Sequence, residues 1–266
     1  MSRYIIDKNK LIENINIIKE KAGVEVIGVV KGNGYGFGMA NLAEILMQNG
    51  IKTFAVTEVY DIPLLRETVL DNDILVMRST CVEEEAKTIA QYDCIATIGS
   101  LSSAEVMDKV SKELGKKTKC HLKIDTGMGR YGFLPSQVES AIKCYDFENL
   151  DFCGAYTHFS SAFHNVQLTK VQLEMFKDTI KQIEKAGKSV GKLHASNSPA
   201  LLNVDGVSLD AVRIGSAFTG RVITKNKNPL NRLGKLEAQV IETKTVPEGY
   251  SIGYNCLLYT SDAADE

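Results

Sequence analysis

Short apolar segments rich in valine and isoleucine alternate eight times with longer segments whose apolar residues recur every three or four positions. The segments predicted as strands are 26–31, 53–57, 74–78, 94–98, 120–125, 152–158, 192–196 and 209–214. Near-continuous apolar strands separated by helices are typical of a parallel sheet covered on both faces. Eight such units favour closure into a (β/α)8 TIM barrel, which commonly needs about 250 residues. An open doubly wound sheet is the alternative.

Two helices can be predicted in more detail. The first is expected to be capped by Asp7 and to bury Leu11, Ile15 and Ile18 on one face. The clearest helical pattern has its apolar positions, expected on the buried face, at Leu168, Val171, Met175, Thr179, Ile180 and Ile183. Gly187 is expected just after its last turn, where a left-handed residue often ends a helix.

The domain organisation follows from where this alternation stops. Residues 1–224 are predicted to form the barrel, and the polar, proline-containing segment 225–232 is predicted to lead out of it. Residues 236–243 alternate like a strand, so 225–255 is expected to begin a second domain. Residues 256–266 fit neither a strand nor a helix period and are expected to be a non-native tail, with a frayed acidic terminus as the alternative.

Charge and composition exclude several classes of function. Lysine and arginine number 31 against 33 acidic residues, so no strong field attracts nucleic acid or an anionic membrane. No apolar segment approaches the roughly 18 residues of a membrane span, and the N-terminus lacks the pattern of an export signal. The six cysteines have no spacing typical of zinc sites or disulfide frameworks. A cytoplasmic protein that binds a small molecule is therefore expected.

Lys31 ends the first predicted barrel strand and is followed by a glycine-rich loop. The C-terminal ends of barrel strands form the catalytic face in this architecture. A low-dielectric wall at that position disfavours the ammonium and favours the free amine, which is the nucleophilic form of lysine. The alternative is a lysine that extends to solvent beside a flexible turn.

Polar residues also end the other predicted strands. Lys123, Asp125 and Arg130 surround the end of the fifth strand, and His158 ends the sixth. A surface ion-pair cluster and a merely hydrogen-bonded histidine are the alternative interpretations. The sequence contains no H-E-x-x-H motif, carboxylate-rich metal cluster or G-x-S-x-G motif, so metal hydrolysis and triad chemistry have no support.

Two segments predict one phosphate site. Ser198 opens a short helix after the seventh strand, and backbone N–H groups at a helix start bind anions. Arg213, Gly215 and Ser216 lie at the end of the eighth strand, and barrels frequently bind phosphate with the loops after strands seven and eight. For Ser198, simple helix capping is the alternative.

Five motifs in order resemble those of the alanine racemase family. They are V-V-K-x-N-x-Y-G, K-I-D-T-G-M-G-R-Y-G-F, T-H-F, H-A-S-N-S and V-R-I-G, and the resemblance covers residues 3 to 255. It implies a pyridoxal 5′-phosphate (PLP) enzyme with an N-terminal barrel, a C-terminal β domain and a head-to-tail homodimer. It also implies interconversion of L-alanine and D-alanine, which supplies D-alanine for peptidoglycan.

The resemblance also implies roles for single residues. Lys31 matches the lysine that holds the cofactor and exchanges the α-proton on one face of the substrate, and Tyr254 matches the tyrosine that acts on the other face from the neighbouring subunit. Arg213 matches the arginine at the pyridine nitrogen, where its fixed charge weakens the electron sink. The other matched residues are His158 against the cofactor ring, Arg130 near the substrate carboxylate, Lys123 as a carbamylated lysine, and Tyr35, Asn197, Ser198, Gly215 and Ser216 as cofactor contacts.

The sequence departs from the family at its C-terminal end. It stops before a further phosphate-binding tyrosine and a Met-Asp pair that the family's second domain supplies. We therefore expect a truncated chain that binds cofactor weakly, forms no stable dimer and racemises slowly or not at all. Alternatives are a racemase for serine or other amino acids, a single-barrel PLP homeostasis protein, a decarboxylase on the same barrel, or a phosphate-sugar enzyme without cofactor.

Overall fold

The computed structural model describes residues 2–251, which divide into two units. One unit contains residues 6–234. The other brings residues 2–5 together with residues from 235 onward, where β1 (Ser2–Ile6) and β10 (Gly234–Ala238) form a two-stranded sheet. Tyr254 and the predicted tail 256–266 lie outside the described residues, and the domain boundary at 224 stays a prediction.

The larger unit is a closed barrel of eight parallel strands, so the predicted (β/α)8 TIM barrel is confirmed. Its strands are β2 (Glu25–Val29), β3 (Thr53–Val56), β4 (Asp73–Ser79), β5 (Ile95–Ile98), β6 (Thr118–Lys123), β7 (Leu150–Tyr156), β8 (Lys192–His194) and β9 (Ala211–Ile214). The open doubly wound alternative is wrong, because β2 pairs with β3 on one side and with β9 on the other.

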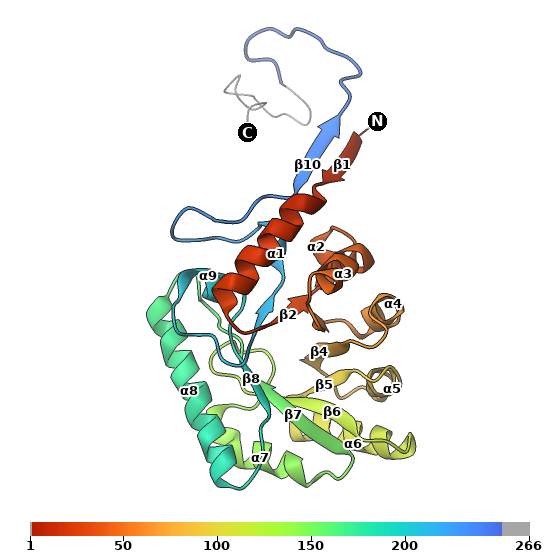
Figure 1. Cartoon of the computed structure of the whole chain (residues 1–266), viewed down its shortest axis with the longest axis vertical. Helices are drawn as coiled ribbons and strands as arrows, with labels where there is room; N and C mark the ends of the chain where they lie inside the picture. Colours follow the sequence, from red (N-terminus) through yellow and green to blue (C-terminus); the bar gives the residue numbers. More distant parts are fainter. Residues whose placement is uncertain (1, 252–266) are drawn as a thin grey trace. The chain divides into compact units, whose positions relative to one another are not determined.

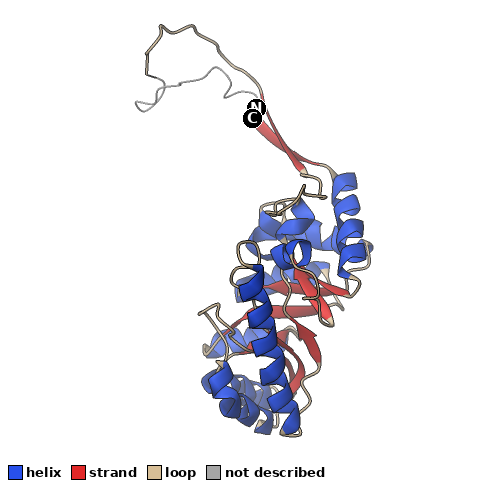
Figure 2. Cartoon of the chain, turned by 90° about the vertical axis from the view of Figure 1, so that its left-hand side faces the viewer, coloured by secondary structure: helices blue, strands red, loops and turns tan. Residues whose placement is uncertain are grey.

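Helices connect the strands and cover the outside of the barrel (Figures 1 and 2). The α-helices are α1 (Lys8–Ala22), α2 (Lys31–Tyr35), α3 (Met39–Gln48), α4 (Ile62–Thr68), α5 (Glu83–Gln91), α6 (Leu101–Glu113), α7 (Val138–Lys143), α8 (Val166–Lys185) and α9 (Ser198–Asn203). Short 3-10 helices are η1 (Val59–Asp61), η2 (Pro135–Gln137), η3 (Cys144–Asp146) and η4 (Ser216–Thr219). In the described residues, no helix is both long and apolar enough to span a membrane.

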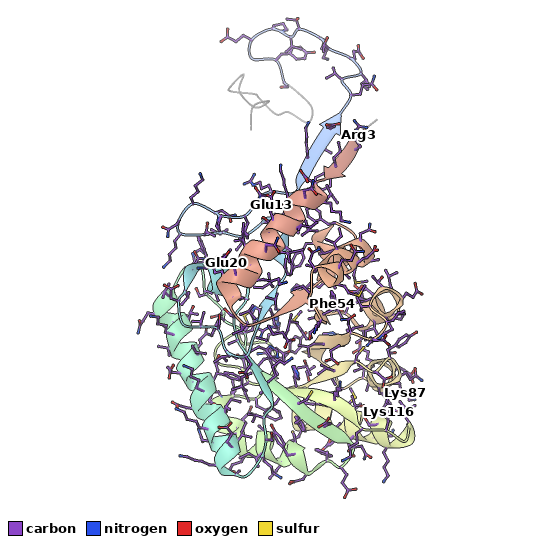
Figure 3. All side chains as sticks on the ribbon, viewed as in Figure 1. Arg3, Glu13, Glu20, Phe54, Lys87 and Lys116 are labelled. Atoms are coloured by element: carbon purple, nitrogen blue, oxygen red, sulfur yellow. The ribbon has the colours of Figure 1, made fainter. Side chains whose placement is uncertain are left out.

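Helix α1 forms as its sequence predicts. The Asp7 side chain accepts hydrogen bonds from the backbone N–H groups at positions 9 and 10, at 3.0 and 3.2 Å, which caps the first turn. Leu11, Ile15 and Ile18 are buried. Glu13 and Glu20 lie on the exposed side of the same helix (Figure 3). The apolar face attaches α1 to the barrel, and the buried Asn14 adds hydrogen bonds from its amide to the Phe218 and Asn231 carbonyls.

Residues of β2, β3, β4, β5 and β9 alternate between two apolar regions. Outward-facing residues such as Phe54, labelled in Figure 3, belong to the main core between strands and helices. A separate cluster lies inside the barrel and consists of Ile27, Val29, Ala55, Leu75, Ile95 and Ala211. These residues come from β2, β3, β4, β5 and β9, so the barrel interior is apolar along these strands.

The predicted buried face of α8 is wrong in its N-terminal half. Leu168, Val171 and Met175 are 40%, 45% and 40% exposed, whereas Thr169 and Gln172 are buried. The polar Gln172 is buried because its amide donates to the Thr126 carbonyl, at 3.1 Å, and accepts from the Ser160 N–H, at 3.1 Å. Hydrogen bonding to two loops at the barrel mouth therefore overrides the apolar pattern.

The segment predicted as a strand at 236–243 is only partly one. β10 ends at Ala238, and residues 239–243 are outside any strand. Its partner β1 was not predicted. The two strands are separated by more than 220 residues, so no local pattern reports their pairing.

Candidate active site

The interior of the barrel becomes polar toward the C-terminal ends of the strands. His121, Lys123, Tyr156, His194 and Arg213 are all at most 3% exposed. Their sequence neighbours on the same strands belong to the outer core, so alternation directs the polar set inward. These five buried polar residues form the floor of the candidate site.

Lys31 stands at the end of β2 and is half-buried. Burial lowers the pKa of its amine, the positive charge of Arg130 lowers it further, and the Glu58 carboxylate acts in the opposite direction. A lowered pKa enlarges the fraction of free amine near neutral pH. The side chain is therefore suited to nucleophilic and proton-transfer chemistry.

The loop after Lys31 makes a left-handed turn, labelled α2 in Figure 1. Asn33 and Tyr35 have φ values of 51° and 57°, which lie in the left-handed region that residues other than glycine rarely adopt. The Asn33 side chain stabilises the turn by accepting a hydrogen bond from the Met39 N–H at 3.0 Å. The turn carries the Tyr35 hydroxyl to the backbone of Ser216 after β9.

Hydrogen-bond donors converge where the ends of β2, β8 and β9 meet. The Ser198 hydroxyl lies 3.2 Å from the Gly215 N–H and 3.4 Å from the Ala217 N–H, both of which donate to it. Burial raises the pKa of Tyr35 to about 12, so its phenol keeps its proton. A Cβ at Gly215 would collide with the Tyr35 hydroxyl, so this close approach requires glycine. We call these four residues the anion cradle.

Asn197, and not Ser198, caps helix α9. Its side chain accepts from the Ala200 N–H at 3.0 Å, and Pro199 follows in the first turn. The capping alternative for Ser198 is therefore wrong, and its hydroxyl is directed to the loop after β9. Asn197 Nδ2 also lies 3.4 Å from His158 Nε2, which places His158 beside the cradle.

Arg213 is 3% exposed and its guanidinium donates to five acceptors. These are His194 Nδ1 at 2.7 Å, the His194 carbonyl at 3.1 Å, the Thr157 carbonyl at 2.7 Å, the Ala195 carbonyl at 3.0 Å and His158 Nδ1 at 3.3 Å. None of the five is a carboxylate. Burial lowers the pKa of Arg213 to about 10, which leaves a positive charge without an ion-pair partner among these acceptors.

Lys123 is buried beneath the mouth. Its amine donates to the Ile124 carbonyl at 3.0 Å and lies 5.1 Å from the centre of the Tyr156 ring. Burial, followed by the charge of Arg213, lowers its pKa to about 7. A substantial fraction of this amine is therefore uncharged at neutral pH, as reaction with an electrophile requires.

Asp125 has a structural task. Burial alone would raise the pKa of its carboxyl, but four backbone N–H groups, from Gly127 to Arg130, donate to it and lower that pKa. It thereby shapes the loop that carries Arg130. The Arg130 side chain is exposed and lies 5.5 Å from the Tyr131 ring centre.

Sequence reasoning missed the floor residues His121, Tyr156 and His194. The Tyr156 hydroxyl lies 3.0 Å from Thr97 Oγ1 and donates to the Met77 carbonyl at 3.0 Å. A period-two pattern was available to find them, since His121 lies two residues before Lys123 and Tyr156 two before His158. Within the described residues, no group of His, Cys, Asp or Glu is arranged to hold a metal ion.

Three histidines of the candidate site are expected to make the stability of the folded chain sensitive to acid. Burial, with nearby positive charges, lowers the pKa of His121 to about 3 and of His158 to about 2, and lowers that of His194 strongly. An unfolded histidine titrates near about 6.5, so below that pH the unfolded chain binds protons that the folded chain does not. We expect the free energy of unfolding to fall by about 1.4 kcal/mol per pH unit for each histidine.

Urea unfolding between about pH 7 and pH 4 measures this effect. The exposed His164 provides a matched control, since H164N is expected to keep the steep loss of stability. A free energy of unfolding that stays constant across this range would contradict the neutral state of the buried histidines.

The fold and this mouth define a class: barrel enzymes that place a lysine with a lowered pKa just after the first barrel strand and hydrogen-bond donors for an anion after the last one. The sequence model described as "Alanine racemase, N-terminal domain" matches residues 6–222. The alanine racemase of Methanococcus maripaludis is 34% identical over 260 residues, covering 95% of this chain and 69% of that protein.

Solved structures agree. Alanine racemase from Clostridium difficile 630 superposes with a TM-score of 0.86 at 28% identity, covering 95% of this chain and 68% of that one. A Bartonella henselae alanine racemase with covalently bound pyridoxal phosphate has a TM-score of 0.82 over 95% of this chain and 70% of its own, and at 24% identity it supports the fold alone. The chain belongs to the alanine racemase family, a family of isomerases, as its motifs predicted.

Proposed function

We propose that this chain carries the barrel of a PLP-dependent racemase that interconverts L-alanine and D-alanine in the cytoplasm and supplies D-alanine for peptidoglycan. The observation that carries the proposal is one mouth containing the low-pKa Lys31, the anion cradle and the unpaired charge of Arg213. Family membership supports the reaction.

The residues present fit pyridoxal phosphate. Tyr35, Ser198 and the backbone N–H groups of Gly215, Ser216 and Ala217 would hold the phosphate, because each supplies a hydrogen-bond donor. Ser196, two residues before Ser198, has a fully buried hydroxyl with no hydrogen-bond partner in the structure. Such orphaned polar atoms are rare unless a ligand or ion satisfies them.

Arg213, His158 and Asn197 would hold the aromatic ring. Arg213 already directs its donors at neutral acceptors, and a fixed positive charge beside a ring nitrogen disfavours protonation of that nitrogen. His158, kept neutral by burial, would pack against the ring. When bound, pyridoxal phosphate supplies a conjugated system that accepts the electron pair left when the α-proton departs.

Lys31 would remove or return the proton at the substrate α-carbon on one face. Its lowered pKa favours the free amine that this task needs. Racemisation requires a second base on the opposite face, because one base would usually return the proton to the side it left. We propose Tyr254 for that task, contributed by the neighbouring subunit of a homodimer of the full-length protein.

Arg130 would bind the substrate carboxylate at the mouth, since its exposed guanidinium offers a bidentate donor pair. We propose that Lys123 is carbamylated and thereby gains a negative charge that positions Arg130. Its pKa of about 7 supports this modification, because only the free amine reacts with carbon dioxide.

The test incubates the chain with saturating pyridoxal phosphate in deuterated water, with L-alanine, D-alanine and L-serine in parallel. Deuterium is expected at the α-carbon of alanine, together with slow appearance of the opposite enantiomer. Faster exchange of serine would contradict the substrate assignment and support the serine alternative. Tight cofactor binding without any exchange at the α-carbon would contradict the proton transfer assigned to Lys31, which needs no second subunit, and would support a cofactor-carrying barrel.

The glycine at the centre of the anion cradle offers a sharper test of cofactor binding. G215A is expected to weaken pyridoxal phosphate binding by about tenfold or more, because the added methyl group displaces the Tyr35 hydroxyl. Y35F is the matched variant, since it removes the same hydroxyl without touching the backbone. Fluorescence titration measures both, and unchanged affinity in both variants would place the phosphate elsewhere.

A further inference from the structure

A chain of hydrogen bonds runs from Arg213 into the barrel interior. His194 Nδ1 lies 2.7 Å from Arg213 Nη1, and His194 Nε2 lies 2.9 Å from His121 Nδ1. Both histidines are at most 3% exposed. The three residues come from the neighbouring strands β6, β8 and β9, with only β7 between β6 and β8.

The direction of each hydrogen bond follows from the donor at one end. A guanidinium only donates, so His194 Nδ1 must accept and carry no proton. The proton of a neutral His194 is then on Nε2, which donates to His121 Nδ1. His121 must in turn carry its own proton on Nε2. Burial keeps both rings neutral, which leaves one proton on each imidazole.

The fold makes special room for the His121 ring. The pairing of β6 with β7 shifts register between Cys120 and His121, and the shift brings Gly154 opposite His121. A Cβ at Gly154 would collide with the imidazole. A strand irregularity and a glycine at one place indicate a built feature of the sheet.

The His194 ring also has little freedom to rotate. It stacks on Tyr156 with ring centres 4.8 Å apart and planes 7° from parallel. The Tyr156 hydroxyl is itself hydrogen-bonded to Thr97 and Met77. Loss of the acceptor at Nε2 would therefore leave a buried N–H group of His194 without a partner, because Arg213 keeps Nδ1 free of a proton and the stacked ring cannot flip.

We propose that His121 is a positioning residue for Arg213, acting by accepting the Nε2 proton of His194 and so holding the His194 ring with its Nδ1 lone pair facing the guanidinium. A proton on His194 Nδ1 would face a donor of Arg213, and the two would repel. His121 thus keeps Arg213 aligned for the ring nitrogen of the cofactor. This inference rests on the proposed function for the role of Arg213, but not for the tautomer itself.

The tautomer can be measured in the cofactor-free protein. The chain has only four histidines, so ¹⁵N-histidine labelling and two-bond ¹⁵N–¹H correlation spectra resolve each ring. The expected result is that His121 and His194 both carry the proton on Nε2. H164L removes the exposed histidine outside this cluster and assists assignment. A proton on His194 Nδ1 in the unaltered protein would overturn the proposal, whatever the variants do.

Two variants of matched size separate positioning from mere packing. H121N keeps an acceptor oxygen near the position of Nδ1 and is expected to preserve the hydrogen bond from His194 Nε2. H121L removes the acceptor and leaves the buried Nε2–H of His194 unpaired, so the Nε2–H signal of His194 is expected to shift and the affinity for pyridoxal phosphate to fall by about tenfold or more. Equal loss of affinity in both variants with an unchanged His194 signal would contradict the proposal.

Discussion

K31A is expected to abolish covalent attachment of pyridoxal phosphate and to slow α-hydrogen exchange of alanine by about 10³-fold or more. Lys31 combines a lowered pKa with a position at the start of the turn that carries Tyr35 of the anion cradle. The anion cradle and Arg213 are untouched by this change, so noncovalent cofactor binding is expected to persist at lower affinity. Absorbance spectra and the exchange assay measure the two effects separately.

The matched control is K117A, which removes an exposed lysine far along the chain between α6 and β6. It is expected to leave both the attachment and the exchange rate unchanged. Exchange that survives in K31A at the rate of the unaltered protein would show that another group moves the proton.

R213L is expected to lower the free energy of unfolding by about 3 kcal/mol even without cofactor. The substitution leaves five buried acceptors without their donor, three of them backbone carbonyls. For a chain of this size, such a loss lowers the melting temperature by roughly 6 to 12 °C. The melting temperature of R213K is expected to lie between those of R213L and the unaltered chain, since lysine keeps the charge but cannot reach all five acceptors.

Thermal unfolding followed by circular dichroism measures these changes. R232L, at an exposed position in the same unit, is the control and is expected to unfold as the unaltered chain does. A melting temperature unaffected by R213L would mean that water satisfies the freed acceptors and that Arg213 does not organise the barrel interior.

The pattern of apolar residues in the strands was enough to predict most of the fold. Runs such as 26–31 and 209–214 are apolar on both faces because one face packs on helices and the other fills the barrel, which is visible in the sequence. The buried face of α8 was mispredicted because Gln172 satisfies loop backbone groups, and such tertiary hydrogen bonds have no periodic signal. The pairing of β1 with β10 likewise depends on residues far apart in sequence.

Site residues could be predicted from the sequence where they lie at the ends of barrel strands. Lys31 and Arg213 sit where the sequence expected them, but the five acceptors of Arg213 come from segments whose convergence only the closed barrel creates. The left-handed turn at Asn33 and Tyr35 was also invisible, since the glycines around it permit several conformations. Asp125 was grouped with the mouth residues, whereas its hydrogen bonds assign it to the loop backbone.

Borohydride reduction after incubation with pyridoxal phosphate, followed by peptide mass mapping, tests directly whether Lys31 binds the cofactor at the barrel mouth. Reduction makes any bond between a lysine and the cofactor permanent, so the modified peptide identifies the lysine. We expect a single pyridoxyl group on the peptide containing Lys31, lost in K31A and retained in K117A. Modification spread over exposed lysines, or absent from the Lys31 peptide, would contradict the assignment of the barrel mouth as a PLP site.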